Sequence, residues 1–443
     1  MRLSGFLTGL SVVGAALAAP FEHQISARAL PSQDDFYTMP EGHEELAPGT
    51  VIRTRSPPAN IGLGKADIKL QDAVQIMYKT TDSFDQSTVA ISTVLIPHNA
   101  DYGKVLSYQM AQDSANPDCA PSYSLQTDPE PVGKFGLFNT QVEILIVASA
   151  LDEGWPVIVP DHEGLHAAFG ASKRAGHTVL DGIRSALQAN NVTGIDSEAR
   201  LALWGYAGGS LVTSWAAELH ESYAPELNIV GTAAGGGTND NLSIFKATNK
   251  SPFAGLIATA YTGLAAEFPV VNQSASPHIL PEYREQFAQV TSMCLVDAFA
   301  EFAFQDVLGK FDDPDLFFTN DDFVAVANGV NLGKATPKMP LRVLDEVIPL
   351  KGEDDLVDSY CSNGGNVQYD RDLVSGHVSL GITGAPKAFV FLRDVLNGKT
   401  QPAGCHRRTV VSTALSPSAA LTVPSLLLRP LLDFLGKDVG PWY

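Results

Sequence analysis

Apolar residues along this chain form short runs that alternate with longer stretches of helical spacing. Apolar runs bounded by turn residues predict strands at 104–108, 155–160, 199–204, 227–233, 341–344 and 367–369. Helical spacing predicts helices at 141–151, 175–189, 211–219 and 386–396. β-Branched alternation around a turn at 82–85 predicts an antiparallel hairpin over 74–97. Strands and helices in this order indicate an α/β fold with a mainly parallel sheet covered on both faces.

One interval, 238–338, interrupts the alternation with apolar segments of helical character and no clear strand. We interpret it as a helical cap inserted over the carboxyl edge of the sheet, where α/β enzymes place their sites. The expected organisation is a signal peptide at 1–18, an N-terminal arm at 19–58, core segments at 59–237 and 339–443, and the cap at 238–338 between them. The apolar run in the C-terminal tail is expected to pack against the core.

The first 20 residues indicate export. Arg2 precedes an apolar run that ends in small residues, so cleavage is expected near Ala18 or Ala19, and the run is too short for a membrane span. No later stretch has the length of a transmembrane helix. We therefore expect a secreted, extracellular protein, monomeric and without a membrane anchor.

The composition limits the classes of molecule that the protein is expected to bind. The 443 residues carry 29 basic and 49 acidic side chains, a net charge of −20 without acidic blocks, and 45% of them are hydrophobic. This balance favours a soluble globular protein and excludes nucleic acid as a partner, because phosphate binding requires clustered Lys and Arg. No cofactor and no metal is expected.

If the protein is exported, its cysteines and the asparagines of its sequons become informative. The four cysteines, an even number, predict two disulfides in an oxidising compartment, with three connectivities open: Cys119, Cys294, Cys361 and Cys405. Sequons predict N-glycosylation at Asn191, Asn241 and Asn272, whereas the sequon at Asn249 is weakened by the proline that follows it, Pro252.

The segment 201–211, LALWGYAGGSL, is the most informative stretch. A buried strand, a glycine-rich turn and a helix follow one another here, the context of the nucleophile elbow of α/β hydrolases, Gly-x-Ser-x-Gly. The central position holds Ala207, whose methyl group neither attacks a carbonyl nor donates a proton. Ser210 lies one helical turn further on, so its hydroxyl is expected to point along the helix flank.

A triad in this fold follows the order nucleophile, acid, histidine. His377, in VSGHVSL, is expected in a loop that reaches back over the sheet, whereas His406 stands in a basic cluster that suits the surface. Asp345 follows directly on an apolar strand and is the predicted acid; Asp354 and Asp355 are the alternatives.

A rival motif, His162-Glu163-Gly-Leu-His166, matches the zinc-protease pattern H-E-x-x-H. Zinc binding needs both histidines on one face of a helix and a third ligand. Pro160 and Gly164 disfavour a helix, and the position of the third histidine holds Ser172. We interpret the match as accidental, with a zinc peptidase as a minor alternative.

Several separated motifs between residues 31 and 405 resemble the fungal secretory lipase family: PSQDDFY, SYQMAQDSANPDCAPSY, VPDHEG, VLDGIRSAL, LALWGYAGGSL, DEVIP, SYCSNGGNV and SGHVS. The resemblance implies an α/β-hydrolase core with a helical cap and a triad at Ala207, Asp345 and His377. It also implies an oxyanion hole formed by the amides of Asp113 and Gly208, and disulfides Cys119–Cys294 and Cys361–Cys405.

Two departures from the family lie in the triad. Ala207 replaces the serine, and the strand before Asp345 is about four residues shorter than in the family, which shifts the carboxylate by several ångströms at about 3.3 Å per residue. The resemblance implies a carboxylic ester hydrolase, a lipase or a deacetylating enzyme such as a trichothecene C-3 esterase, acting on a hydrophobic ester or lipid, with contact between the cap and a lipid surface. The chain as written is expected to be impaired or inactive. The alternative is a non-catalytic lipid- or ester-binding protein.

Overall fold

The computed structural model describes residues 29–237, 239–346 and 350–415. The predicted signal peptide and the apolar run of the C-terminal tail lie outside these residues. Within the described ranges, one large sheet has the strand order β1-β4-β5-β7-β6-β8-β9-β10-β11-β12. From β7 to β12 along this order, including β6, neighbouring strands pair in parallel. At the other end of the sheet, β1 with β4, β4 with β5 and β5 with β7 pair antiparallel. The predicted α/β fold with a mainly parallel sheet is confirmed.

The bounds of the strands in this sheet are β1 Val51–Arg55, β4 Asp72–Thr81, β5 Ser87–Ile96, β6 Lys104–Gln109, β7 Val157–Pro160, β8 Arg200–Tyr206, β9 Ile229–Gly235, β10 Leu341–Glu346, β11 Val367–Asp372 and β12 His406–Val410. A separate small pair consists of β2 Gly62–Leu63 and β3 Ala66–Asp67. The predicted hairpin is β4 and β5.

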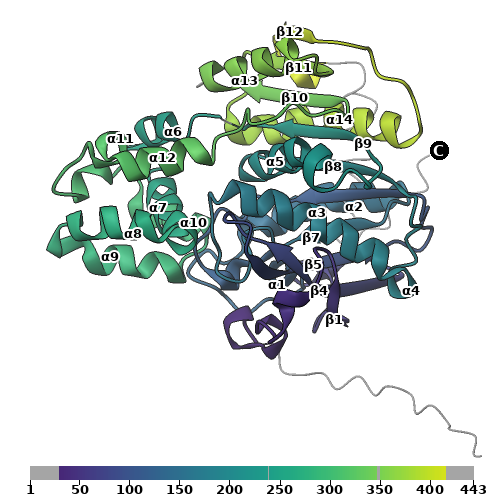
Figure 1. The fold of residues 1–443 in the computed structure, drawn as a ribbon, viewed down its shortest axis with the longest axis horizontal. Coiled ribbons are helices and arrows are strands. Elements are labelled where there is room, and N and C mark those ends of the chain that lie inside the picture. Colours follow the sequence, from purple (N-terminus) through teal and green to yellow (C-terminus); the bar gives the residue numbers. More distant parts are fainter. Residues whose placement is uncertain (1–28, 238, 347–349, 416–443) are drawn as a thin grey trace, which may run out of the picture.

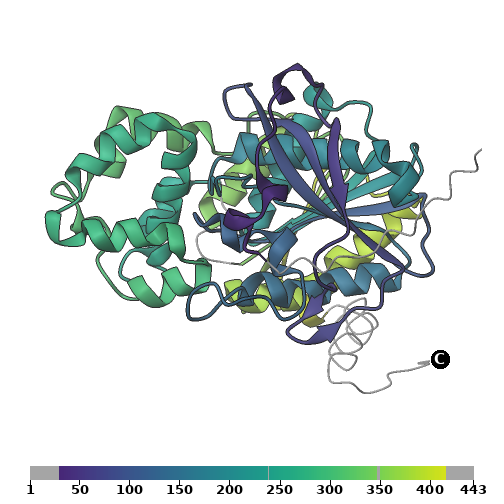
Figure 2. The same cartoon turned by 90° about the horizontal axis from the view of Figure 1, so that it is seen from below.

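Helices of the core are α1 Pro121–Ser124, α2 Phe138–Asp152, α3 Ser172–Gln188, α4 Asn190–Thr193, α5 Gly208–Tyr223, α13 Leu350–Ser362 and α14 His377–Leu396. Between β9 and β10 come α6 Asn241–Thr248, α7 Gly255–Glu267, α8 Pro269–Ala275, α9 Arg284–Ala288, α10 Leu295–Phe302, α11 Leu316–Thr319 and α12 Asp321–Gly329. These helices form a lobe beside the sheet, at the left of Figures 1 and 2.

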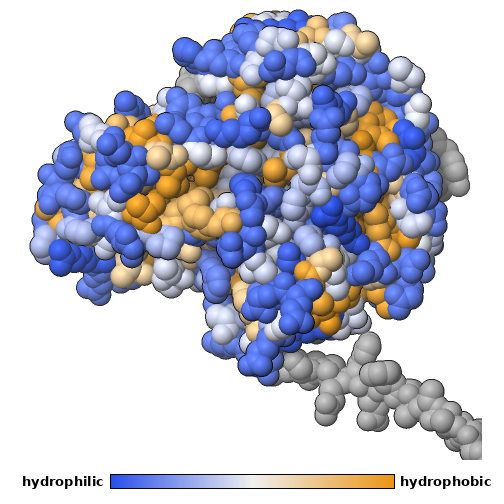
Figure 3. All heavy atoms as spheres, in the orientation of Figure 1, coloured by the Kyte–Doolittle hydropathy of each residue, from blue (hydrophilic) through white to orange (hydrophobic). Residues whose placement is uncertain are grey.

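Helices cover both faces of the sheet, because its central strands are apolar on both sides. One face packs on α2 and α14, with Ile144, Val147 and Phe389 among the buried side chains. The opposite face packs on α3, α5 and α13. The lobe of α6 to α12 has an apolar core of its own, rich in phenylalanine. Apolar residues cluster on the surface of this lobe where it meets the core that contains the sheet (Figure 3).

Two local predictions were wrong, and two strands were missed. Helix α14 begins at His377 instead of 386, because glycines permit a close approach: a Cβ at Gly381 would lie 3.1 Å from the Tyr206 ring, and one at Gly384 would lie 3.3 Å from Leu344. Strand β10 extends to residue 346 and therefore contains Asp345. The edge strands β1 and β12, rich in charged residues, carry no apolar run and were not predicted.

Among the described residues, every helix is too short or too polar to span a lipid bilayer.

Candidate active site

The turn between β8 and α5 has a strained backbone at Ala207. Its φ of +53° and ψ of −124° form a combination that residues with a Cβ atom rarely adopt. Glycines surround it because side chains do not fit: a Cβ at Gly205 would overlap the Gly209 carbonyl, and one at Gly209 would overlap the Gln109 carbonyl. Such strain costs about 1–3 kcal/mol and is typical of functional sites. The backbone is that of a nucleophile elbow with a methyl group at its centre.

Asp113, in the loop after β6, lies against the first residue of α5. It has φ +49°, and a Cβ at Gly208 would overlap its carboxylate. Asp113 is 6% exposed. Burial raises the pKa of Asp113 to about 7, against the opposing effects of His377 and of the Gly208 N–H. The structure therefore brings the two predicted oxyanion residues together and places His377 near them.

His377 is the first residue of a helix, whereas we expected a loop residue. The helix begins here because the Ser379 hydroxyl accepts a hydrogen bond from the Gly376 N–H at 2.9 Å. The Tyr206 hydroxyl donates to the His377 carbonyl oxygen at 2.5 Å, and the two rings lie 5.4 Å apart between centroids. Tyr206 directly precedes Ala207, so this contact holds the histidine beside the elbow.

Asp345 lies inside β10 and is 4% exposed. The register pairs Leu344 with Gly235, and Gly235 with Tyr206, so Asp345 stands level with the elbow along the sheet. Strand alternation gives Asp345 the same face as Leu341 and Val343, which pack with α13. Helix α14, which begins at His377, covers the other face. We expected Asp345 to follow the strand, but β10 runs to Glu346 and includes it.

The alternative residues occupy other environments. Asp354 lies on α13 and pairs with Arg371 at 2.6 Å, and Asp355 pairs with Lys351 at 2.5 Å. His406 is exposed in the edge strand β12. The Ser210 side chain packs against Gly237, where a Cβ would lie 2.8 Å from its hydroxyl.

The H-E-x-x-H segment forms turns instead of a helix, and Gly164 at its centre has φ +71°. His162 is buried and its Nε2 lies 2.8 Å from the Met110 carbonyl oxygen, while His166 is exposed. Within the described ranges, no three His, Cys, Asp or Glu side chains are arranged to hold a metal ion.

The structure contains the disulfides Cys119–Cys294 and Cys361–Cys405, the pairing that the family resemblance implies. The first joins the loop after β6 to the start of α10 in the helical lobe, across 175 residues. The second joins α13 to the residue before β12.

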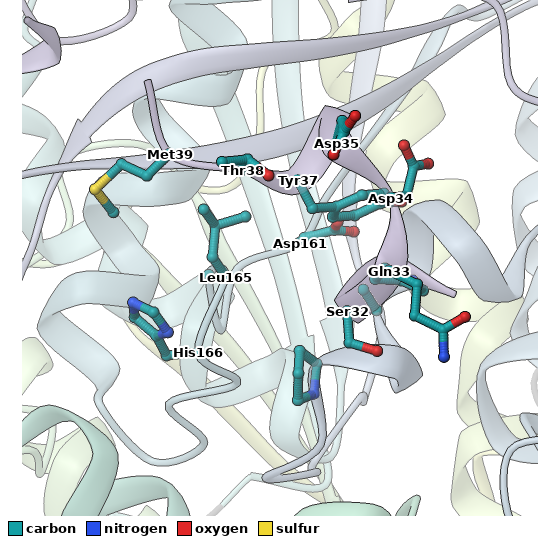
Figure 4. A pocket seen from close by; sticks show the side chains of 14 residues that line it. Ser32, Gln33, Asp34, Asp35, Tyr37, Thr38, Met39, Asp161, Leu165 and His166 are labelled. Atoms are coloured by element: carbon teal, nitrogen blue, oxygen red, sulfur yellow. The ribbon is translucent and has the colours of Figure 1, made fainter. Parts of the chain in front are cut away.

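Cavities lie on both sides of the 161–166 segment. A cavity of about 300 Å³ separates it from the N-terminal arm and is lined by Ser32, Tyr37, Met39, Asp161 and His166 (Figure 4). None of the predicted triad or oxyanion residues lines this cavity. Two much smaller cavities flank the elbow, one lined by Asp113 and Gly208 and the other by Tyr206 and Leu380.

Two half-buried residues at the site were not predicted. The Glu143 carboxylate accepts hydrogen bonds from the Tyr108 hydroxyl at 2.7 Å and the Ala111 N–H at 3.0 Å, which fixes the start of the loop that carries Asp113. A lone acid in the apolar pattern of 141–151 was the available signal for it. Tyr206 carries no sequence signal beyond its place before Ala207.

Glycan occupancy is expected to differ among the four sequons. Asn191 and Asn272 are exposed on α4 and α8, whereas the Asn241 amide donates to Asn331 at 2.7 Å. The Asn249 side chain bonds both Asp306 and the Val307 N–H. After expression through a eukaryotic secretory route, peptide mapping with isotope-labelled deglycosylation should find glycans at Asn191 and Asn272, fewer at Asn241 and none at Asn249. A fully occupied Asn249 would contradict this order.

Stability is expected to fall between pH 6.5 and pH 8. Burial raises the pKa of Asp113 and Asp161 to about 7 and that of Glu143 to about 8. A folded-state pKa above the unfolded value gives stability that is complete below the unfolded pKa and is lost as the pH rises through the folded one. The free energy of unfolding should drop by on the order of 2 kcal/mol across this interval.

Urea unfolding at constant ionic strength measures this change in the free energy of unfolding. The variant Glu143→Gln should show a smaller change over the same pH interval. Below pH 6.5 an opposite effect enters, because burial lowers the pKa of His162 and His177 to about 4. Stability that is constant or rises from pH 6.5 to pH 8 would contradict the prediction.

Comparisons with known proteins are consistent across sequence and structure. The sequence signature of the family described as Secretory lipase matches residues 132–404. Lipase A of Arthroderma benhamiae is 41% identical over 418 residues, covering 93% of this chain and 89% of that protein. A Mycobacterium tuberculosis protein named "Probable inactive lipase MT1628" is 36% identical, covering 88% and 87%. The crystal structure of Candida antarctica lipase A superimposes with a TM-score of 0.81 at 27% identity, covering 94% of this chain and 99% of that one.

Proposed function

The chain belongs to the secretory lipase family, and from this premise we propose that its site is that of a carboxylic ester hydrolase with the nucleophile missing. The observation that carries the proposal is Ala207 at φ +53° and ψ −124°. An alanine gains nothing from this conformation, which serves to present a side chain at the mouth of the sheet. The turn thus keeps the backbone of a nucleophile elbow without the hydroxyl.

The roles follow from the chemistry of a serine triad. A serine at position 207 would attack the ester carbonyl carbon while His377 takes its proton and then passes it to the alcohol that leaves. The Asp113 and Gly208 amides would hold the oxyanion, and Asp345 would orient the imidazole. Water then releases the acid from the acyl-enzyme. Without the hydroxyl, catalysis is limited to binding and oxyanion stabilisation.

Asp345 would act from the carboxyl end of β10, where it stands level with the elbow along the sheet. Ala207 favours a site that has lost its catalytic function.

A second candidate is a non-catalytic protein that binds a lipid or a hydrophobic ester. The relative named "Probable inactive lipase" favours it, because a protein that is similar over most of both chains carries a name that denies activity. The turns of the H-E-x-x-H segment give no support to a zinc peptidase.

The substrate or ligand proposed is a hydrophobic ester, either a lipid or an acetylated secondary metabolite such as a trichothecene. Apolar surface at the junction of the two lobes suits such a molecule and contact with a lipid surface (Figure 3). Two disulfides and the N-terminal sequence support secretion, and we propose a monomer.

Hydrolysis of p-nitrophenyl acetate and octanoate by this chain and by its Ala207→Ser variant tests the proposal. Activity that appears only with serine supports a hydrolase scaffold. Absence of activity in both, with retained binding of octanoate ester, would support the binding protein instead.

A further inference from the structure

Phe304, in the turn that follows α10 of the helical lobe, combines a strained backbone with an exposed side chain. Its φ is +61° and it is 69% exposed. A bulky residue with positive φ is a rare outlier, and an exposed phenylalanine gains no stability from burial. Asp113 and Ala207 at the candidate active site also have positive φ, and such outliers are typical of functional positions. The side chain at position 304 therefore points to a role outside the folded chain.

The shape of this turn is fixed by backbone contacts. The Phe304 N–H donates to the Ser251 carbonyl oxygen at 2.8 Å, and the Lys250 N–H donates to the Gln305 carbonyl oxygen at 3.1 Å. These two bonds hold residue 304 in the left-handed region, which glycine or asparagine adopts at lower cost. The fold thus explains the conformation at this position but not the choice of phenylalanine.

The outer face of α10, which leads to this turn, is apolar. The opposite side of the helix packs on α7, where Ala298 is buried against Gly255. The two acids of the helix, Asp297 and Glu301, share another side and bond to groups of the protein there. The side chains that remain partly or fully exposed are those of Val296, Phe299, Ala300 and, just after the helix, Ala303.

Phe253 extends this face. It is 40% exposed, and its ring meets that of Phe299 edge to face, with 5.4 Å between the centroids. Lys250 and Asp306, beside the turn, form an ion pair at 2.9 Å and so add no net charge. Together these apolar residues form a surface that we call the aromatic patch: Phe253, Val296, Phe299, Ala300, Ala303 and Phe304.

We propose that the aromatic patch docks the protein on a lipid–water interface whose lipids carry no net charge. This inference rests on the proposed function, in which the substrate is a hydrophobic ester. Protruding rings enter a soft apolar layer without needing a preformed pocket, and a lipid surface offers such a layer. The net charge of −20 repels anionic lipids, whereas the uncharged patch matches a zwitterionic or neutral surface.

The position of α10 connects the patch with the candidate active site. Cys294, directly before α10, is bonded to Cys119, a few residues beyond Asp113 along the chain. In the first turn of α10, the Asp297 carboxylate accepts from the N–H groups of Lys134 and Phe135, in the segment that leads to α2. A lipid surface at the patch would therefore contact the part of the helical lobe that is joined to the loop carrying Asp113.

Binding needs no nucleophile, so the test uses the full chain with Ala207 and measures co-flotation with phosphatidylcholine vesicles at about 150 mM salt. Phe304→Asn, which suits the left-handed backbone, is expected to lower the partition coefficient about 10-fold, and its combination with Phe253→Ser about 30-fold or more. Phe304→Trp should bind at least as well as the parent. Vesicles in which phosphatidylglycerol replaces roughly a third of the lipid should bind less. Unchanged binding of Phe304→Asn, or tighter binding to the anionic vesicles, would overturn the inference.

Thermal unfolding separates docking from a structural role. Because asparagine adopts positive φ more readily than phenylalanine, Phe304→Asn should leave the Tm unchanged or raise it by up to about 3 °C. A lower Tm together with weaker binding would make Phe304 a structural residue and overturn the inference. A lipid-free dimer of the parent that Phe304→Asn dissociates, seen by light scattering, would assign the patch to a second copy of the chain and overturn it as well.

Phe84 supplies a matched control. It is 51% exposed in the β4–β5 turn, where its ring contacts that of Phe268 at the opposite end of α7 from Phe253. Phe84→Asn should keep the partition coefficient within about twofold of the parent. An equal loss with Phe84→Asn and Phe304→Asn would attribute binding to general surface hydrophobicity and overturn the role of the patch.

The two proposals fail in different ways. If Ala207→Ser hydrolyses soluble p-nitrophenyl esters while the chain binds no vesicles, this inference alone is refuted. If the chain binds vesicles through Phe304 while Ala207→Ser hydrolyses no ester, the docking surface stands and the proposed hydrolase site alone is refuted.

Discussion

Replacing Ala207 with serine is expected to raise hydrolysis of p-nitrophenyl esters by roughly 10³-fold or more over the chain with alanine. The estimate follows from serine proteases, in which removal of the nucleophile leaves only the catalysis supplied by the oxyanion hole and by binding. The strained elbow already accommodates the Cβ atom of residue 207, and serine adds only a hydroxyl group to it. Initial rates with acetate and octanoate esters measure the gain.

Two controls decide whether the gain comes from the proposed site. His377→Gln in the serine background should return the rate to that of the alanine chain. Ser210→Ala in the alanine chain should leave any residual rate unchanged, because Ser210 packs against Gly237. A residual rate that disappears with Ser210→Ala would identify Ser210 as the nucleophile and contradict the assignment.

Replacing Glu267 with leucine is expected to lower the free energy of unfolding by about 3–5 kcal/mol, because it leaves the buried Arg174 unpaired. The two side chains are 4% and 5% exposed and 2.7 Å apart. Glu267 also accepts from the Ser83 N–H at 2.7 Å. The pair thus joins the end of α7 to α3 and to the turn of the β4–β5 hairpin.

The double replacement Arg174→Leu with Glu267→Leu should recover most of this loss, since apolar side chains substitute well for a buried ion pair. Urea unfolding followed by tryptophan fluorescence measures both, with disulfides intact. Asp85→Asn, which breaks the exposed pair with Lys173, should change stability by less than about 1 kcal/mol. Single and double variants of equal stability would refute the role of the pair.

Much of the fold was predictable because its physical requirements are local. The turn at 205–209 needs glycines wherever backbones touch, and the central strands are apolar because helices cover both faces. These requirements appear directly as residue types. The disulfide pairing, by contrast, came only from family resemblance, since spacing alone leaves three connectivities open.

The details of the site depend on contacts that sequence patterns do not record. Helix α14 passes through Pro386 and begins at His377 because Gly381 and Gly384 pack on Tyr206 and Leu344. Tertiary packing there overrides the preference of proline for a helix start. The burial of Glu163 beside Asp113 was equally hidden, since the motif that contains Glu163 matched only a zinc-protease pattern, which we interpreted as accidental.

Among the contacts that hold the helical lobe to the core, two differ in kind: the disulfide Cys119–Cys294 is covalent, and the buried pair of Arg174 with Glu267 is ionic. A thiol reductant breaks the first and leaves the second intact. Reduction would therefore remove the covalent tie between the start of α10 and the segment a few residues beyond Asp113, while the end of α7 stays attached to α3 through its ion pair.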